Sequence, residues 1–128
     1  MAEFSNYLEN KVLDHVLRNT SYTSPSTVYV GLFLSDPTDA GSGTECTGSA
    51  YARQTLSVTT ASGGIVTSSA DVTFPQATGS WGAITHLGLL DALTSGNLLM
   101  HTPLTTSKTI DNGDILKISS GNLTVTLD

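Results

Sequence analysis

The side chains best suited to chemistry in this sequence are one cysteine and three histidines. Cys46 lies in a Gly-rich acidic loop with no histidine nearby in sequence, so we expect a packed or solvent-facing thiol rather than a nucleophile. His86 and Asp91 share one expected strand, and their spacing points them to opposite faces. The sequence also has no G-x-S-x-G motif. We therefore predict that the protein is not an enzyme.

Two groups of residues have the chemistry of metal ligands. Asp36, Asp39 and Glu45 share the loop over residues 35–50, but their spacing does not follow the EF-hand pattern. We interpret this loop as a flexible contact arm. His86 and His101 can meet across a hairpin, where a polar pair is expected because no cysteine or acidic third ligand has suitable spacing. The sequence therefore predicts no metal and no cofactor.

A sugar-binding role is the alternative that rests on aromatic residues. Trp81 is the only tryptophan and lies in an expected loop over residues 76–82, where it could stack on a sugar together with Tyr51 or Tyr22. This alternative requires an exposed Trp81. A single loop tryptophan more often closes the end of a β core, and we favour that interpretation.

The charge pattern argues against nucleic acid and membrane partners. The net charge is −6, and the five basic residues are dispersed, so no basic stripe is available for phosphates. No apolar run approaches the roughly 20 residues that span a bilayer. The N-terminal residues lack the basic and apolar regions of a signal peptide, so we expect synthesis in the cytoplasm of a host.

An amphipathic helix is expected over residues 5–19. Leu8, Val12 and Val16 recur at the spacing of one helix face, with Leu13 and Leu17 beside them. This stripe packs either on its own subunit or on a neighbouring one, and the sequence leaves both possibilities open.

The ends of this helix are marked by local signals. Asn6 is the expected N-cap, with Glu9 three residues later as in a capping box. Asn19 is the expected end, and residues 20–26 form a linker in which Pro25 prevents continuation of the helix.

The remainder of the chain predicts a β domain over residues 27–128. Short apolar or alternating segments are separated by turns, including Asn112-Gly113, and Gly31 is expected to allow a close approach of another group. The expected strands cover residues 27–34, 51–60, 65–67, 70–74, 84–91, 98–102, 105–110, 115–119 and 123–127. We predict a single domain over residues 1–128, mainly β: a β-sandwich or barrel-like domain of short antiparallel strands with one N-terminal amphipathic α-helix.

Several segments spread over nearly the whole chain carry a family resemblance. They are SNYLENK (residues 5–11), PSTVYVGLF (25–33), YARQ (51–54), VTFP (72–75), WG (81–82), THLGLLD (85–91), GNLL (96–99), NGD (112–114) and LTVTLD (123–128). In these segments the chain resembles small virion proteins of tailed bacteriophages, of the tail-fibre type or the capsid-decoration type.

The resemblance implies a structural protein of the virion without catalytic residues. We favour a capsid decoration or cement protein that binds the major capsid protein as a homo-oligomer such as a trimer, because the chain lacks the long repetitive shaft of a fibre. The alternative is a tail or tail-fibre component that binds tail proteins or the host. The residues expected at the interface are Leu8, Val12, Val16, Asp36, Asp39 and Trp81.

Overall fold

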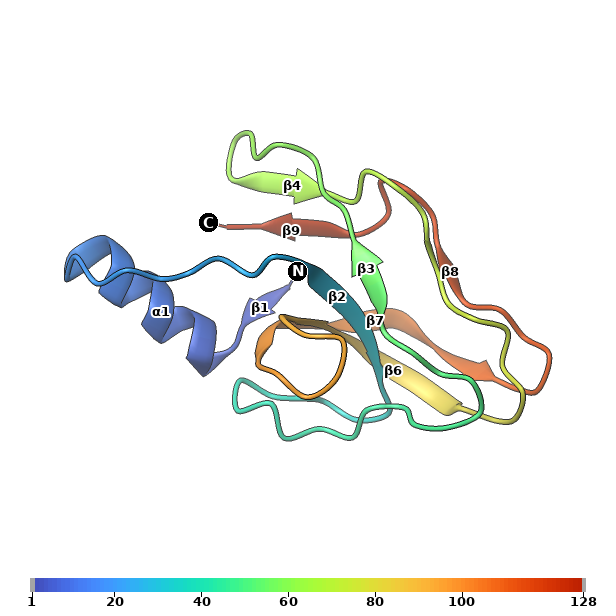
Figure 1. Cartoon of the computed structure of the whole chain (residues 1–128). Helices are drawn as coiled ribbons and strands as arrows, with labels where there is room; N and C mark the ends of the chain where they lie inside the picture. The colour runs from blue at the N-terminus through green and yellow to red at the C-terminus, as the bar shows by residue number, and fades with distance from the viewer. Residues whose placement is uncertain (1, 128) are drawn as a thin grey trace.

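The computed structural model describes residues 2–127, which form nine strands and one helix (Figure 1). The helix is α1 (Asn6–Leu17), and the strands are β1 (Glu3–Phe4), β2 (Val28–Phe33), β3 (Gln54–Leu56), β4 (Ile65–Thr67), β5 (Val72–Thr73), β6 (Gly82–Leu90), β7 (Leu98–Ile110), β8 (Lys117–Ile118) and β9 (Thr124–Thr126). The predicted fold class is confirmed: the chain is mainly β and antiparallel, with one N-terminal helix. Within residues 2–127 the strands do not close into a barrel.

A five-stranded sheet organises the fold, with the strand order β1-β7-β6-β2-β3. All its neighbours are antiparallel. Two small ribbons, β4–β9 and β5–β8, stand over this sheet in Figure 1. The main apolar cluster draws on the sheet and on both ribbons, so it forms the layer between them.

The side chains at the centre of this layer come from distant parts of the sequence. Val30, Leu32 and Ile84 from the sheet are completely buried, and Phe74 after β5 is nearly so. Burial of large apolar side chains is the main favourable contribution to folding, at about 25 cal/mol for each Å² removed from water. The two ribbons are therefore held to the sheet mainly by this apolar contact.

Two glycines face each other across the strand pair β2–β6 and allow close packing. Gly31 is paired with Gly88. A Cβ atom on Gly88 would lie 2.5 Å from a ring carbon of Phe33, and one on Gly31 would lie 2.9 Å from Leu90 Cδ1. The close approach expected at Gly31 is therefore confirmed.

The helix differs from its prediction at its first residue. Ser5, not Asn6, is the N-cap: its backbone is extended and its Oγ accepts a hydrogen bond from the Leu8 amide at 3.2 Å. The same hydroxyl donates to the carbonyl oxygen of Leu98, the first residue of β7. A cap that also binds the sheet is favoured over Asn6, whose side chain is exposed. The helix ends at Leu17 with Arg18 as its C-cap, two residues before the expected end at Asn19, which has a positive φ of 56°.

Strand lengths account for the other differences. The segments expected at residues 98–102 and 105–110 form one strand, β7, of 13 residues. Its pairing with β6 shifts register near Pro103, which lacks the amide hydrogen that a regular ladder requires. The strand expected over residues 51–60 is only three residues long as β3. Strand β1 was not expected, because its two residues give no periodic pattern in the sequence.

Replacing Ser5 by alanine tests the double role of this side chain. Ser5→Ala removes the helix cap and the bond to Leu98, and we expect a loss of about 1–2 kcal/mol in the free energy of unfolding. Asn6→Ala is the matched control, since Asn6 is the neighbouring residue that the local pattern marks as the cap. Urea denaturation of both variants makes the measurement, and equal losses would contradict the assignment of the cap to Ser5.

Candidate functional site

The apolar stripe of α1 is buried at one end of the helix and exposed at the other. Leu8 in the first turn is buried, Val12 is half-buried, and Val16 is 68% exposed. Figure 1 shows the reason: the first turn of α1 lies beside β1, and its far end extends away from the sheets. The start of the helix is therefore part of the fold, while its end offers an apolar surface.

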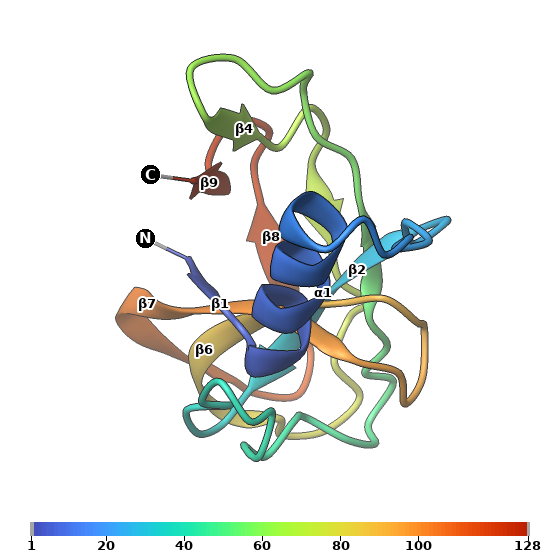
Figure 2. The same cartoon turned by 90° about the vertical axis from the view of Figure 1, so that its left-hand side faces the viewer.

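Two further leucines enlarge that surface. Leu13 is 54% exposed and Leu17 is 74% exposed. Together with Val16 they form what we call the helix-end patch (Leu13, Val16 and Leu17). All three residues lie in the last five positions of the helix. Figure 2, which views the molecule from the side of α1, shows the helix in front of the sheets. A neighbouring molecule can reach the patch without a rearrangement of the chain.

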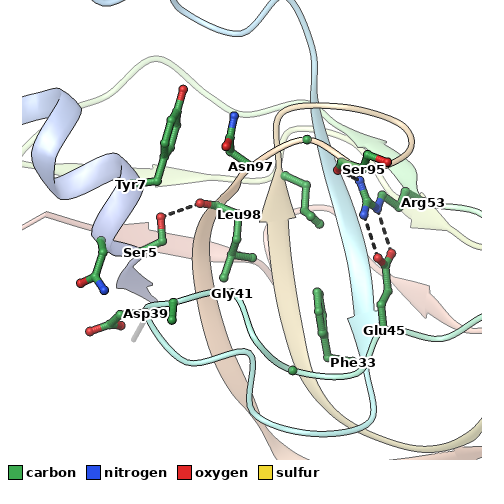
Figure 3. A pocket seen from close by; sticks show the side chains of 15 residues that line it. Ser5, Tyr7, Phe33, Asp39, Gly41, Glu45, Arg53, Ser95, Asn97 and Leu98 are labelled. Atoms are coloured by element: carbon green, nitrogen blue, oxygen red, sulfur yellow. Dashed lines mark hydrogen bonds and ion pairs between the residues drawn. The ribbon is translucent and has the colours of Figure 1, made fainter.

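A cleft of about 550 Å³ opens between the start of α1, the loop after β2 and the turn between β6 and β7 (Figure 3). Its apolar part is a small separate core cluster of Phe33, Leu90 and Leu98. Its polar lining consists of Ser5, Asn6, Tyr7, Asp39, Glu45, Arg53, Ser95 and Asn97. These lining residues include no histidine or cysteine, so the cleft suits hydrogen bonding to a partner better than nucleophilic chemistry.

A buried ion pair forms one wall of this cleft. Arg53 binds Glu45 through two parallel hydrogen bonds, Nε to Oε2 at 2.8 Å and Nη2 to Oε1 at 2.7 Å. The remaining guanidinium nitrogen donates to the carbonyl oxygens of Ala92 and Ser95, at 2.7 and 2.8 Å. Only 8% of the Arg53 side chain is exposed. The pair therefore ties two loops, residues 34–53 and 91–97, to each other.

Tyr51 extends the same network into the core. Its hydroxyl donates to Glu45 Oε2 at 2.6 Å and accepts from the Leu32 amide at 2.9 Å. Burial raises the pKa of Tyr51 well above its ordinary value, and the bond to Glu45 raises it further. The bonds to Glu45 raise the pKa of Arg53 as well. Tyr51 therefore stays protonated and Arg53 stays charged near neutral pH.

Trp81 lies in the core rather than on the surface. The residue is 4% exposed, its ring meets the Tyr51 ring edge-on at a centroid distance of 5.4 Å, and its Nε1 donates to the Ser49 carbonyl. The exposed aromatic platform that the sugar-binding alternative requires is therefore not formed by Trp81. For the same reason, its side chain is not available at the surface of this chain for the contact that the sequence analysis expected.

Cys46 is buried and packs in the same region. Its Sγ lies 3.7 Å from the Trp81 carbonyl oxygen, to which it donates. Burial, with the nearby Glu45 carboxylate, raises the pKa of the Cys46 thiol to about 11. The thiolate is the reactive form of cysteine, so this thiol is unreactive near neutral pH.

The loop acids Asp36 and Asp39 are brought to a histidine far away in sequence. His101 Nε2 lies 2.9 Å from Asp39 Oδ1, and His101 Nδ1 lies 3.7 Å from Asp36 Oδ1. The carboxylate of Glu3 also approaches His101 Nε2, at 3.9 Å. Spacing along the chain gives no sign of these acidic partners, because they come from segments distant in sequence from His101. Glu45, expected with these acids, is bound to Arg53 instead.

Comparison with known proteins places the chain among the structural proteins of phage virions. A family model described as podophage GP4 fiber I protein gp80 matches residues 3–126. The chain therefore belongs to this family of phage fibre proteins. A comparison with curated proteins gives no match. The prediction of a phage virion protein is confirmed, and the fibre family fits the tail-fibre alternative better than capsid decoration.

The length of the helix shows whether it could span a membrane. Within residues 2–127, no helix has the length and the apolar character needed to cross a bilayer.

Removing the charge of Glu45 tests the role of the ion pair. In Glu45→Gln, the largely buried Arg53 charge loses its counter-charge, and we expect a loss of about 2 kcal/mol in the free energy of unfolding. The matched control is Asp14→Asn, which breaks the exposed pair with Arg18 on the helix and changes stability little. Denaturant melts of both variants make the comparison, and similar stabilities would show that the buried pair does not hold the loops.

Proposed function

We propose that this protein is a structural component of a podophage tail fibre that binds other tail proteins. The observation that carries the proposal is the match of the fibre family to residues 3–126. The exposed helix-end patch and the polar cleft provide surfaces for such contacts. The loops around the cleft are tied by the Arg53–Glu45 pair, so the binding surface is largely formed before a partner arrives.

The contacts of the cysteine and of two of the histidines do not favour a catalytic role. The one cysteine has a pKa that disfavours the thiolate, and its nearest polar contact is a backbone carbonyl. His86 bonds to the adjacent Thr85 hydroxyl, and His101 to Asp39. We therefore propose that the protein acts by binding alone and as a single domain.

The abundance of the protein in the virion tests the tail location. A tail has few symmetry-related positions, whereas a decoration protein covers the many positions of the shell. We expect a copy number far below that of the major capsid protein, measured by mass spectrometry of purified virions with isotope-labelled peptide standards. Antibody labelling should mark the tail. Copy numbers comparable with the major capsid protein, with labelling over the shell, would overturn the tail assignment in favour of capsid decoration.

We further propose that the helix-end patch binds a second copy of this chain. The chain carries a net charge of −6, which opposes association of copies over most of the surface. The helix region differs, because Glu9 and Asp14 are balanced by Lys11 and Arg18. Self-association through α1 therefore buries apolar area without bringing two strongly acidic surfaces together.

Placing a charge in the patch tests this contact. We expect the wild-type protein to form an oligomer and Val16→Glu to shift it toward the monomer, because a carboxylate would be buried at the interface. Sedimentation velocity over a range of concentrations makes the measurement. Ile115→Glu, at a similarly exposed apolar residue away from the helix, is the control. A monomeric wild-type protein, or equal oligomerisation of all three proteins, would contradict the proposal.

A further inference from the structure

The residues around His101 combine a buried imidazole with carboxylates from separate segments. His101 on β7 is 5% exposed. Glu3 on β1 is its register partner across the strand pair. Asp39 belongs to the loop after β2, and its backbone carbonyl accepts from the Asn6 amide at 2.9 Å, which fixes the loop beside the start of α1.

The two nitrogens of His101 lie near carboxylate oxygens of three residues, one of them at hydrogen-bond distance. Nε2 lies 2.9 Å from Asp39 Oδ1 and 3.9 Å from Glu3 Oε2, while Nδ1 lies 3.7 Å from Asp36 Oδ1. A neutral imidazole has one N–H group, and ionised carboxylates only accept. In the hydrogen bond to Asp39 the proton lies on Nε2. With the proton on Nδ1 instead, the Nε2 lone pair faces the oxygens of Asp39 and Glu3 and can bind a cation between them. A bound cation would satisfy all three of these groups.

We propose that Glu3, Asp39 and His101 form a binding site for a divalent transition metal such as Zn²⁺. One imidazole nitrogen and two carboxylate oxygens, with water in a remaining position, are a ligand set that Zn²⁺ accepts. The three ligand atoms lie within 4.8 Å of one another. A tetrahedral Zn²⁺ site with bonds of about 2.1 Å holds its ligand atoms about 3.4 Å apart. The observed distances of 2.9 and 3.9 Å from Nε2 lie on either side of that value.

The surroundings of these ligands favour a metal in two further ways. Asp36 Oδ1 lies 3.7 Å from the second nitrogen of His101, and a small movement would place this carboxylate where an outer partner fixes the ring tautomer and strengthens the ligand. An open hollow of about 530 Å³ lies over Glu3 and Asp39 and is also lined by Glu9. The hollow gives a cation a path from solvent, and the acidic lining attracts it. Glu3 and Asp39 are sufficiently exposed to move the short distance that coordination requires.

A metal at this position would add a cross-link between three segments that hydrogen bonds already hold together. Strand β1 has only two residues, and it leads directly into the N-cap of α1. A metal that binds Glu3, Asp39 and His101 attaches this short strand to β7 and to the loop after β2. Metal binding to the folded state alone would then raise its stability by mass action.

Calorimetric titration of the metal-stripped, full-length protein with ZnCl₂ tests the site, with CaCl₂ and MgCl₂ for comparison. We expect one Zn²⁺ per chain, little binding of Ca²⁺ or Mg²⁺ because these ions prefer sites made only of oxygen ligands, and a higher melting temperature with Zn²⁺. Glu3→Gln and Asp39→Asn each change an exposed side chain, so both variants should fold. Each should weaken Zn²⁺ binding by at least about tenfold, as should Asp36→Asn, which removes the outer carboxylate.

The control is Asp14→Asn, which removes a carboxylate on the outer part of α1 and should leave Zn²⁺ binding unchanged. The proposal is overturned if the wild-type protein shows no saturable Zn²⁺ binding, or if Glu3→Gln and Asp39→Asn bind Zn²⁺ as tightly as the wild type. Equal weakening by Asp14→Asn would also overturn it, since that result would indicate non-specific attraction to an acidic protein.

Discussion

The buried pair between Arg53 and Glu45 is the interaction on which the organisation of the loops depends. Much of the polypeptide around the sheet has no regular ladder, so its backbone groups need other partners. Arg53 supplies donors to two carbonyls of the β6–β7 turn, and Glu45 receives both Arg53 and Tyr51. The ion pair therefore orders the loops over residues 34–53 and 91–97, and Tyr51 connects them to β2 through the Leu32 amide. The cleft beside α1 has its shape because these segments cannot move independently.

Fold class was predictable because it follows from local periodicity and turn chemistry. The apolar segment at residues 27–34 gave β2, and the segment at 84–91 gave β6, since both carry continuous apolar runs bounded by polar turns. The N-cap could not be assigned from the same signals. Ser5 and Asn6 are both good capping residues, and the choice between them depends on a carbonyl of Leu98 that is remote in sequence.

The candidate sites were less predictable, because their composition depends on which side chains are buried and which distant segments the fold brings together. A loop tryptophan such as Trp81 can act as a stacking surface for a sugar, but the indole of Trp81 contacts the Tyr51 ring and the Ser49 carbonyl instead. Asp39 and His101 meet across 62 positions of the chain, a distance at which spacing rules carry no information. The apolar stripe of α1 was visible in sequence, yet only the position of the helix on the sheet edge separates its covered start from its open end.

The outward direction of α1 gives the smallest elements of the fold a mechanical role. A fibre protein that is held by its helix end would transmit tension from α1 to the sheet. One path runs through the first turn of α1, the Ser5 hydroxyl and the two residues of β1, and another follows the chain through residues 18–27 into β2. The hydrogen bonds of an antiparallel pair lie perpendicular to the strands. A pull along β1 therefore acts across its hydrogen bonds to β7, and all of these bonds bear the force at the same time. On the path through β1, the load is carried by Glu3, Phe4 and Ser5 together with the bond from the Asn6 amide to the Asp39 carbonyl and the buried Leu8.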